Sequence, residues 1–304
     1  MLLFQQMLVL FFLMMIGYFL RKKEIFGEDT CKAVSWLVVH IANPALILSG
    51  SISRSKPLAP GEIGLCLGVS VLIFAGLILT AAAVTPVFRI PKKSRGTYRV
   101  MLVFSNVGFM GFPVVSAVYG ADALLYASVF LIPYNLLLYT YGIEEMRGLG
   151  TERRKISWKK ILNIGVVTSV LSLLIAVFDL QMPDFVRTAV SSLSGLTAPL
   201  SMMVIGASMV NLRIKELFAD GRLLAFALLK LILLPTAGML LLGLFLKNEM
   251  LLGVCLVMLA TPVGSMTAML AQQYGGDYEL DSRGVALTTL LSVLTMPLVS
   301  MLVG

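Results

Sequence analysis

Residues 104–113 read FSNVGFMGFP and interrupt an otherwise apolar stretch of the chain. A second apolar stretch is interrupted in the same way by LATPVGSMT, residues 259–267. Proline removes a backbone donor and frees the carbonyl four residues before it, while glycine tolerates unwound backbone. Both stretches therefore have the apolar character of a long helix, yet each carries helix-breaking residues and neutral polar side chains near its middle.

The composition of the whole chain identifies the solvent in which these stretches fold. Of 304 residues, 58% are hydrophobic and 13% are charged, and the mean hydropathy is +0.93. The charged fraction is about half that of a soluble protein. A soluble domain cannot bury so much apolar surface, so the expected solvent is a lipid bilayer. A soluble enzyme, a disordered chain and a disulfide-stabilised secreted domain are excluded, and Cys31, Cys66 and Cys255 form no metal-binding or disulfide pattern.

The chain contains ten apolar stretches of the length that a helix needs to cross a bilayer, about 20 residues. We therefore predict an all-α membrane protein with ten transmembrane helices. The first is predicted to be a span rather than a cleaved signal, because Arg21, Lys22 and Lys23 follow it. The ten spans are residues 2–20, 32–50, 62–88, 100–119, 123–142, 161–179, 188–210, 223–246, 250–272 and 284–303.

The distribution of Lys and Arg orients these spans. With the N-terminus outside, 19 of the 24 Lys and Arg residues fall in inner loops, four fall in outer loops, and Lys230 lies within a span. The positive-inside rule then predicts a multi-pass plasma (inner) membrane protein with both termini outside. This topology and the attraction of anionic lipid headgroups explain the net charge of +8, so no nucleic-acid partner is expected.

Motifs in the two halves recur at an offset of 155 residues. The matched pairs are Tyr119-Gly120 with Tyr274-Gly275, Pro44 with Pro199, and Asn106 with Thr261. We therefore predict one five-helix repeat over residues 1–142, a basic cytoplasmic loop over 143–160 and a second repeat over 161–304. Because five is odd, the second repeat is inverted relative to the first. Inverted repeats are typical of secondary transporters, although channels and membrane enzymes can also be duplicated.

The two broken stretches, spans 4 and 9, form the predicted binding site. A single break is often a simple kink, whereas matched breaks in two halves point to the binding site of a transporter. Unpaired backbone is costly in hydrocarbon and persists where protein buries it or where it lines a polar cavity. Unwinding also exposes half-helix N-termini, which suit a carboxylate. We predict an anionic substrate at the crossing of the two spans, hydrogen-bonded by Asn106, Ser105, Thr261, Ser265 and Thr267.

Three further polar residues inside the spans each have two interpretations. Asn135 either joins two helices through a hydrogen bond or contacts the substrate. His40, on one helix face with Asn43, is interpreted first as a neutral packed histidine and second as a pH sensor or proton carrier. Lys230 is expected to extend its ammonium group to the inner face, and the alternative is a counter-charge to a bound anion.

The placement of acidic residues limits the coupling mechanisms. All 16 Asp and Glu residues fall in loops or at the ends of predicted spans, so no carboxylate is expected deep in the membrane. Dedicated sodium/proton antiport and coupling through a buried Asp or Glu are therefore disfavoured. With one histidine, no deep carboxylate and no cysteine beside a base, neither an activated nucleophile nor a metal site can be assembled. We predict that the protein is not an enzyme and has no cofactor.

The polar motifs together resemble the auxin efflux carrier family over essentially the whole chain. They are ANPAL at 42–46, SNVGFMGFP at 105–113, Tyr134-Asn135 with Tyr139 and Gly142, and ATP at 260–262. The short loop at 143–160 is similar to that of the prokaryotic members, commonly called malate or malonate permeases, rather than to plant carriers with long central loops. The resemblance implies two inverted five-helix repeats, as in bile-acid symporters and sodium/proton antiporters.

The resemblance also implies how such a protein works. Spans 4, 5, 9 and 10, with spans 3 and 8 beside them, would form a transport domain that moves as an elevator. Spans 1, 2, 6 and 7 would form the scaffold, where homodimer contacts usually lie. Asn106 would contact the substrate carboxylate. Related carriers have a proline crossover in both halves, but Pro113 and Pro262 are six residues apart in repeat register, so we expect the second crossover to be displaced.

We therefore predict a secondary active transporter that moves a small organic anion, a carboxylate such as malate, malonate or an auxin-like monocarboxylate, by alternating access. The alternatives are a passive channel or facilitator with the same fold and a non-transporting membrane sensor. The expected partners are the anion, the lipid bilayer and a second copy of the chain. The predicted substrate-binding residues are Asn106, Ser105, Gly108, Gly111, Pro113, Asn135, Tyr134, Asn43, Thr261, Pro262, Gly264 and Ser265.

Overall fold

The computed structural model describes residues 2–53, 60–147, 162–210 and 214–303, and these residues form helices and no β-strand. The predicted loop at 143–160 lies largely outside the described residues. Seven helical segments of the described chain are long and apolar enough to cross a membrane, and three shorter apolar helices, Val107–Tyr119, Ile164–Val177 and Glu249–Ala260, accompany them. The seven are Leu3–Lys22, Glu28–Ile52, Gly61–Val87, Ala121–Arg147, Asp184–Ser208, Gly221–Gly243 and Tyr278–Val303. Each of the ten predicted spans contains helix, but the count of ten stays a prediction.

The first half of the chain contains long helices with short π-helical insertions, η1, η3 and η4, and one 3-10 turn, η2. In chain order the elements are α1 (Leu2–Lys22), α2 (Glu28–Leu37), η1 (Val38–Ala42), α3 (Asn43–Ile52), α4 (Pro60–Val87), η2 (Lys92–Ser94), α5 (Arg95–Val103), η3 (Val107–Gly111), α6 (Phe112–Tyr119), α7 (Ala121–Leu137), η4 (Leu138–Gly142) and α8 (Ile143–Arg147).

Asx side chains start several helices of the second half: Asn163, Asp220 and Asn248 each accept a backbone N–H of the first helical turn. In chain order the elements are α10 (Ile164–Val177), α11 (Asp184–Ser194), α12 (Thr197–Ser208), α13 (Ile214–Ala219), α14 (Gly221–Leu228), η5 (Leu229–Leu233), α15 (Leu234–Gly243), α16 (Glu249–Ala260), α17 (Ser265–Tyr274) and α18 (Tyr278–Val303).

A proline follows three of the π-helical insertions at the same distance. Pro44, Pro113 and Pro235 each lie two residues after the end of η1, η3 and η5. A proline ring clashes with the carbonyl four residues earlier and cannot donate to it, so the helix widens locally to accommodate both effects. Each insertion therefore contains a carbonyl to which the proline four residues later cannot donate.

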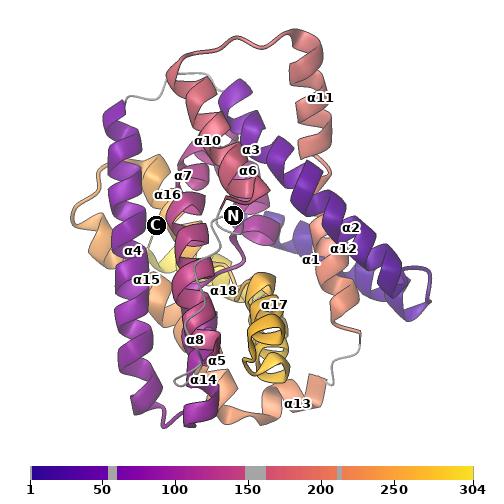
Figure 1. Cartoon of the computed structure of the whole chain (residues 1–304), viewed down its shortest axis with the longest axis vertical. Helices are drawn as coiled ribbons and strands as arrows, with labels where there is room; N and C mark the ends of the chain where they lie inside the picture. The colour runs from indigo at the N-terminus through magenta and orange to yellow at the C-terminus, as the bar shows by residue number, and fades with distance from the viewer. Residues whose placement is uncertain (1, 54–59, 148–161, 211–213, 304) are drawn as a thin grey trace.

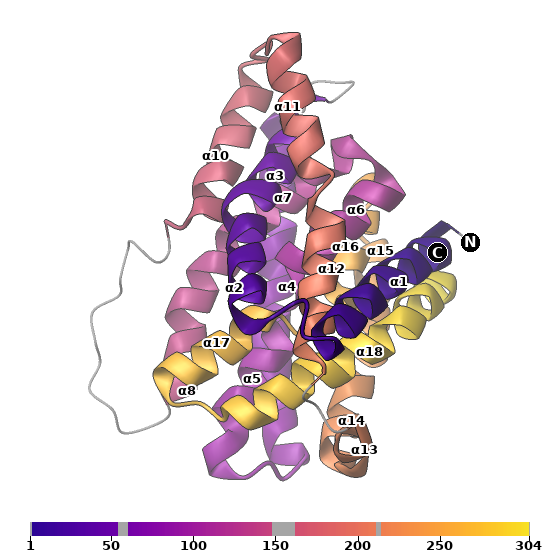
Figure 2. The ribbon, with the colours of Figure 1, turned by 90° about the vertical axis from the view of Figure 1, so that its right-hand side faces the viewer.

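Figure 1 shows α4 along one edge of the molecule with α7 beside it, while α1, α2 and α12 gather at the opposite edge. Figure 2 shows α1 lying along α18, with which it is in contact. The crossing of α1 and α12 is very close, because a β-carbon added at Gly17 would lie 2.0 Å from the backbone oxygen of Met203. One added at Gly206 would lie 1.8 Å from the backbone oxygen of Met14. Small residues allow such contact between helix backbones in a membrane.

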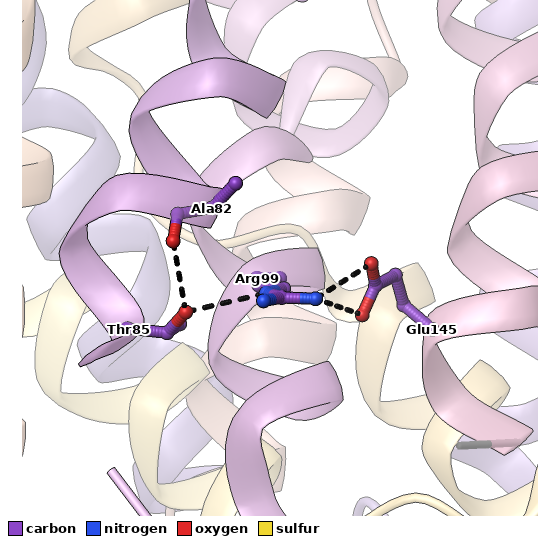
Figure 3. A network of polar contacts seen from close by, with 4 residues as sticks. All are labelled: Ala82, Thr85, Arg99 and Glu145. Atoms are coloured by element: carbon purple, nitrogen blue, oxygen red, sulfur yellow. Dashed lines mark hydrogen bonds and ion pairs between the residues drawn. The ribbon is translucent and has the colours of Figure 1, made fainter. Parts of the chain in front are cut away.

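A polar network joins α4, α5 and α8 (Figure 3). The Arg99 guanidinium donates from Nη1 to both carboxylate oxygens of Glu145, at 3.1 and 3.2 Å, and from Nε to the Thr85 hydroxyl at 3.3 Å. The backbones of α5 and α8 also approach closely, because a β-carbon at Gly96 would lie 1.9 Å from the backbone oxygen of Glu145. Arg99, counted among the inner charges, therefore also fixes one end of α5.

Gly120 and Gly275, which the 155-residue offset matches, each lie at the C-terminal end of a helix. Gly120 follows α6 with a φ of 81°, and Gly275 follows α17 with a φ of 85°. They are the glycines with positive φ among the described residues. Since an L side chain is strained in this conformation, the repeated Tyr-Gly motif has a local structural reason in both halves.

Candidate functional site

The two broken stretches meet and pair through their backbones. The Asn106 N–H donates to the Pro262 carbonyl at 2.7 Å, and the Gly264 N–H donates to the Phe104 carbonyl at 3.0 Å. Between them, Ser105 and Val263 form an isolated antiparallel β-bridge. Residues 104–106 and 262–264 thus satisfy each other's backbone groups where their helices are unwound, as buried broken helices require.

Glycine is needed at this junction because the two backbones nearly touch. A β-carbon at Gly264 would lie 2.9 Å from the Ser105 carbonyl oxygen and 3.3 Å from the Tyr134 hydroxyl. Gly111 faces Thr261 less tightly, at 3.7 Å from the Thr261 methyl group to the position of an added β-carbon. The predicted residues Ser105, Tyr134, Gly111, Thr261 and Gly264 are therefore brought together.

Four half-helix ends converge on the junction. The C-terminal ends of α5 and α16 lead into it, and the N-terminal ends of η3 and α17 lead out of it. Aligned peptide dipoles give a helix N-terminus a partial positive charge and unpaired N–H groups. At η3 the Asn106 side-chain oxygen accepts from the Phe109 N–H at 3.3 Å, whereas the N-cap of α17 is Gly264 and supplies no side-chain acceptor.

The Asn106 side chain has a hydrogen-bond donor that is not used within the protein. Its side-chain oxygen caps η3, while its amide nitrogen, Nδ2, is buried and has no hydrogen-bond partner. The residue is 3% exposed. Asn43, at the start of α3, lies nearby, with its Nδ2 atom 3.4 Å from the position of a β-carbon at Gly108 and its buried Oδ1 atom also without a partner. A buried polar group without a partner costs about 1–3 kcal/mol, so the site has unused capacity for hydrogen bonds.

The carbonyl that Pro113 frees is bound by a helix that the sequence did not connect to the site. The Ser201 hydroxyl, on α12, donates to the Phe109 carbonyl at 2.9 Å. Phe109 is the residue four positions before Pro113, as the proline geometry requires. A serine in an apolar helix is a weak signal by itself, so Ser201 could not have been assigned to this carbonyl from sequence alone.

Lys230 lies in the protein interior rather than at the membrane surface. It is 1% exposed, and its ammonium group donates to the Leu102 carbonyl at 2.8 Å and to the Ser105 hydroxyl at 2.7 Å. The prediction that this side chain extends to the inner face is therefore wrong. The ammonium group instead binds the C-terminal end of α5, where the helix dipole favours a positive charge.

The adjacent residues Tyr134 and Asn135, both predicted to bind substrate, contact different parts of the protein. The Tyr134 hydroxyl donates to the Ser105 carbonyl at 3.1 Å, and its ring packs against Phe104. The Asn135 side chain donates to the Leu131 carbonyl and accepts from the Asn163 amide at 2.7 Å. Its hydrogen bonds therefore join α7 to the start of α10, the first of the two interpretations of this residue.

Threonine side chains complete the second break. The Thr261 hydroxyl donates to the Met258 carbonyl at 3.1 Å, and the Thr288 hydroxyl of α18 accepts from the Val263 N–H at 3.1 Å. Thr267 donates to the Gly264 carbonyl at 2.7 Å. Pro262 and Gly264 are buried, and Thr288 was not predicted to belong to the site. The second break is thus held by α18 as the first is held by Lys230.

A cavity of about 730 Å³ reaches the start of α17. It lies between α12, α13, α17 and α18, and the exposed side chains of Met269 and Tyr278 line it. Its volume is in the range of small-molecule sites. Of the predicted site residues, Ser265 lines it. The other polar lining residues include Ser208, Gln272, Glu279, Ser282 and Arg283.

Asp281 is a buried carboxyl group in the first turn of the last helix, and it thus lies at the end of a span, where acidic residues are expected. The predicted last span starts at 284, whereas α18 begins at Tyr278, and the burial of Asp281, which is 0% exposed, is not expected from the sequence. Its Oδ1 atom accepts from the Thr267 hydroxyl at 2.6 Å, and its Oδ2 atom has no partner. Hydropathy does not reveal that this residue is buried. Glu279 and Arg283 lie two positions before and after it, so the local sequence is polar and has the pattern of a loop.

His40 lies outside the junction. It is exposed on η1, its ring stacks on that of Trp36 at 4.5 Å between centroids, and its Nδ1 atom is 3.0 Å from the Trp36 carbonyl. The expected packing is thus against one aromatic neighbour rather than within the core. Among the described residues, no cluster of three His, Cys, Asp or Glu side chains is positioned to hold a metal ion.

Comparison with known proteins agrees with this architecture. The sequence profile of the family described as membrane transport protein matches residues 2–300. The chain is 26% identical over 306 residues to an uncharacterized transporter of Methanocaldococcus jannaschii, with 96% of each chain covered. It is 23% identical over 288 residues to an uncharacterized transporter of Methanothermobacter thermautotrophicus, covering 94% and 93% of the two chains. This is a family of transporters rather than of enzymes. The chain with its two paired, broken helices therefore belongs to the membrane transport protein family, the auxin efflux carrier family that its motifs resemble.

Proposed function

We propose that the protein is a secondary active transporter that carries a small organic anion, held at the junction of the two broken helices, by alternating access. The observation that carries the proposal is the buried amide nitrogen of Asn106, which has no hydrogen-bond partner beside two half-helix N-termini. A carboxylate would accept from this nitrogen and would be favoured by the partial positive charge of both N-termini. The expected substrates are carboxylates such as malate, malonate or an auxin-like monocarboxylate.

The cavity supports a route to this site. Its wall runs from exposed side chains of α17 and α18 to Ser265, the first residue of the uncapped α17 helix. Arg283 in the same wall would attract an anion. If both termini lie outside, the end of α17 and the start of α18 lie at the inner face of the membrane. The cavity opens between these two ends, so we propose that the described conformation faces inward.

The binding role of the junction rests on contacts of different kinds. Asn106 would contact the substrate directly, with Asn43 and Ser265 around it. The Tyr134 hydroxyl bonds to the Ser105 carbonyl, and the Lys230 ammonium group bonds to the Ser105 hydroxyl. These three residues would hold the junction in shape. Lys230 would also make the electrostatic environment favourable for an anion, although its hydrogen bonds are made to protein groups.

Several matched features support the proposed inverted repeat of ten spans. The two breaks occupy equivalent places in residues 1–142 and 161–304, and Gly120 and Gly275 end equivalent helices with positive φ. We propose that α5, η3, α6, α7, α16, α17 and α18 belong to the moving domain. The close pair α1 and α12 would belong to the scaffold, where a homodimer contact would lie. The orientation in the plasma membrane follows from the Lys and Arg distribution.

Thermal unfolding of the purified protein in a panel of mono- and dicarboxylates tests the proposal. A carboxylate at 100 times its dissociation constant should stabilise the protein by about 2.7 kcal/mol. Asn106→Ala should lose this stabilisation, while Gln273→Ala, which shortens an exposed amide on α17, should keep it. Equal stabilisation of Asn106→Ala, or no stabilisation by any carboxylate, would contradict the proposed site or substrate class.

A flux measurement separates a carrier from a passive pore. In proteoliposomes, a carboxylate that stabilises the protein should show saturable counterflow, because one occluded site must change sides to carry each anion. Single-channel currents across a planar bilayer would instead support a channel with the same fold.

A further inference from the structure

The Thr267 hydroxyl connects Asp281 to the junction of the broken helices. Its oxygen lies 2.6 Å from Oδ1 of Asp281 and 2.7 Å from the Gly264 carbonyl oxygen. Gly264 is the residue whose N–H binds the Phe104 carbonyl across the junction. A continuous chain of short contacts therefore runs from a buried carboxyl group on α18 to the point where the two breaks pair.

The number of hydrogens along this chain depends on the charge of Asp281. A threonine hydroxyl has one hydrogen to donate, and here it has two acceptors within bonding distance. If Asp281 is ionised, the hydroxyl can donate to only one of the two, and the Gly264 carbonyl then keeps the Thr267 backbone N–H, at 3.0 Å, as its donor. If Oδ1 carries a proton, Asp281 donates to Thr267, Thr267 donates to Gly264, and both short contacts are hydrogen bonds. The neutral acid is therefore the form in which both short contacts of the Thr267 hydroxyl are hydrogen bonds.

No positive charge in the described chain compensates an ionised Asp281: no Lys or Arg lies within ion-pair distance of it, and its Oδ2 atom has no partner. Lys230, on the packed element η5, bonds to Leu102 and Ser105. Arg222 on α14 and Arg283 on α18 itself make no ion pair with it. A buried, uncompensated carboxylate is costly, above all in a membrane protein.

Ionisable residues of α5 and α17, and Asp277 just before α18, are engaged elsewhere. On α5, Arg99 pairs with Glu145, and the Tyr98 ring packs against Phe226. On α17, the Tyr274 ring lies under the Arg147 guanidinium. The carboxylate of Asp277, one turn before Asp281, accepts from the Leu280 N–H at 3.2 Å and from the Ser94 hydroxyl at 3.2 Å.

We propose that Asp281 is a proton-binding site whose occupancy is linked to the conformation of the broken-helix junction, and that this proton is the one coupled to transport. In the protonated form, the neutral chain from Asp281 through Thr267 to Gly264 fixes the first turn of α17 against α18. Loss of the proton turns the Thr267 hydroxyl toward the carboxylate, removes its hydrogen from Gly264 and leaves a buried charge. That charge favours a conformation in which the contact of α17 with α18 opens to water.

The linkage is reciprocal. If the described conformation binds the proton more tightly than the alternative one, proton binding shifts the protein toward it by that difference in affinity. The turn of α18 that carries Asp281 also supplies Glu279, Ser282 and Arg283 to the wall of the cavity. Proton binding and access of an anion to the junction are thus governed by the same turn. The transport part of this inference rests on the proposed function, whereas the proton site does not.

Infrared spectroscopy of the full-length protein in proteoliposomes tests the proton site without any substrate. At about pH 7 exposed Asp and Glu side chains, which titrate at about pH 4, are ionised. Wild type should still show the carbonyl band of a protonated carboxylic acid. Asp281→Asn should lose the band, and Glu279→Gln, an exposed residue two positions away, should keep it. Absence of the band in wild type, or its persistence in Asp281→Asn, would overturn the proposal.

A second variant keeps the experiment decisive if Asp281→Asn does not fold. Thr267→Val retains the acid but removes the hydroxyl that it bonds, so the band should shift in frequency rather than vanish. An unshifted band in Thr267→Val would show that the hydroxyl is not the partner of the acid and would overturn the linkage to Gly264.

Radiolabelled malonate tests the coupling. An asparagine at position 281 can donate to Thr267 as the protonated acid does but cannot release a proton. Asp281→Asn should therefore retain malonate exchange between equal concentrations and lose accumulation driven by an imposed pH gradient. Equal accumulation by wild type and Asp281→Asn, or equal loss of exchange and accumulation, would overturn the coupling role. If wild type moved no malonate, that result would count against the proposed substrate class, while the infrared band would still decide the proton site.

Discussion

The ammonium group of Lys230 lies 2.7 Å from the hydroxyl of Ser105, a residue 125 positions earlier in the chain and at the centre of the first break. The same ammonium group lies 2.8 Å from the Leu102 carbonyl, in the last turn of α5. A buried cation therefore occupies the negative end of a half-helix. It supplies from within the protein the donors that the unwound segment cannot supply itself.

Replacing Lys230 by methionine should destabilise the protein. Methionine has a similar length but no hydrogen-bond donor, so two buried acceptors at the junction lose their partner at a cost of about 1–3 kcal/mol each. The variant also removes a buried positive charge, and this opposing effect is stabilising. We expect a lower thermal unfolding midpoint for Lys230→Met and no change for Lys247→Met, whose side chain is exposed. An unchanged or raised midpoint for Lys230→Met would show that burying the ammonium group costs more than its hydrogen bonds contribute.

Ser201→Ala should loosen the contact between α12 and the first break. The Phe109 carbonyl, freed by Pro113, would lose the hydroxyl that binds it at 2.9 Å. We expect a loss of about 1 kcal/mol in the free energy of unfolding. Ser192→Ala is the control, because the exposed Ser192 hydroxyl bonds within its own helix, α11. If the two variants unfolded alike, the carbonyl would have found another donor, and the bond to α12 would not hold η3 in place.

The meeting of the two breaks was predictable because Pro and Gly interrupt both apolar stretches in corresponding parts of a repeat. The hydrogen-bond partners across the junction were not predictable. Hydrogen bonds from Asn106 to Pro262 and from Gly264 to Phe104 depend on the crossing angle and depth of two helices, which the sequence does not encode in any local pattern. Ser201 and Thr288 bind backbone groups of the breaks, and nothing distinguishes them in sequence from other hydroxyls in apolar helices.

The burial of Lys230 and of Asp281 was not predicted, for a shared physical reason. Reasoning from hydropathy treats a span as surrounded by lipid, so a lysine should extend to the nearest surface and a carboxyl group at the end of a span should face water. In the folded protein, neighbouring helices supply the polar partners instead: Leu102 and Ser105 for Lys230, and Thr267 for Asp281. The surroundings of a polar residue in a helical bundle are set by packing, which single-sequence periodicity does not reveal.

The ion pair of Arg99 with Glu145 should contribute little by itself (Figure 3). The side chains are 28% and 21% exposed, so solvent still screens the charges. A double-mutant cycle with Arg99→Met and Glu145→Gln should give a coupling energy of about 1 kcal/mol, because two hydrogen bonds add to the screened attraction. Arg99→Met alone should cost more than Glu145→Gln, since it also removes the donor to Thr85. A coupling energy near zero would mean that the close backbone contact at Gly96, rather than the charges, holds α5 to α8.

Gly264→Ala should separate the two breaks and abolish the site without preventing membrane insertion. The added methyl group would lie 2.9 Å from the Ser105 carbonyl oxygen, a backbone atom that can move only if the Asn106–Pro262 and Gly264–Phe104 hydrogen bonds lengthen. We expect a lower unfolding midpoint and loss of carboxylate-induced stabilisation. Gly76→Ala, in α4, is the matched control, because nothing lies within 4 Å of its added β-carbon and alanine is the better helix former. Wild-type behaviour of Gly264→Ala would mean that the junction tolerates a wider spacing, and the substrate would then have to be held without the two half-helix N-termini at their observed separation.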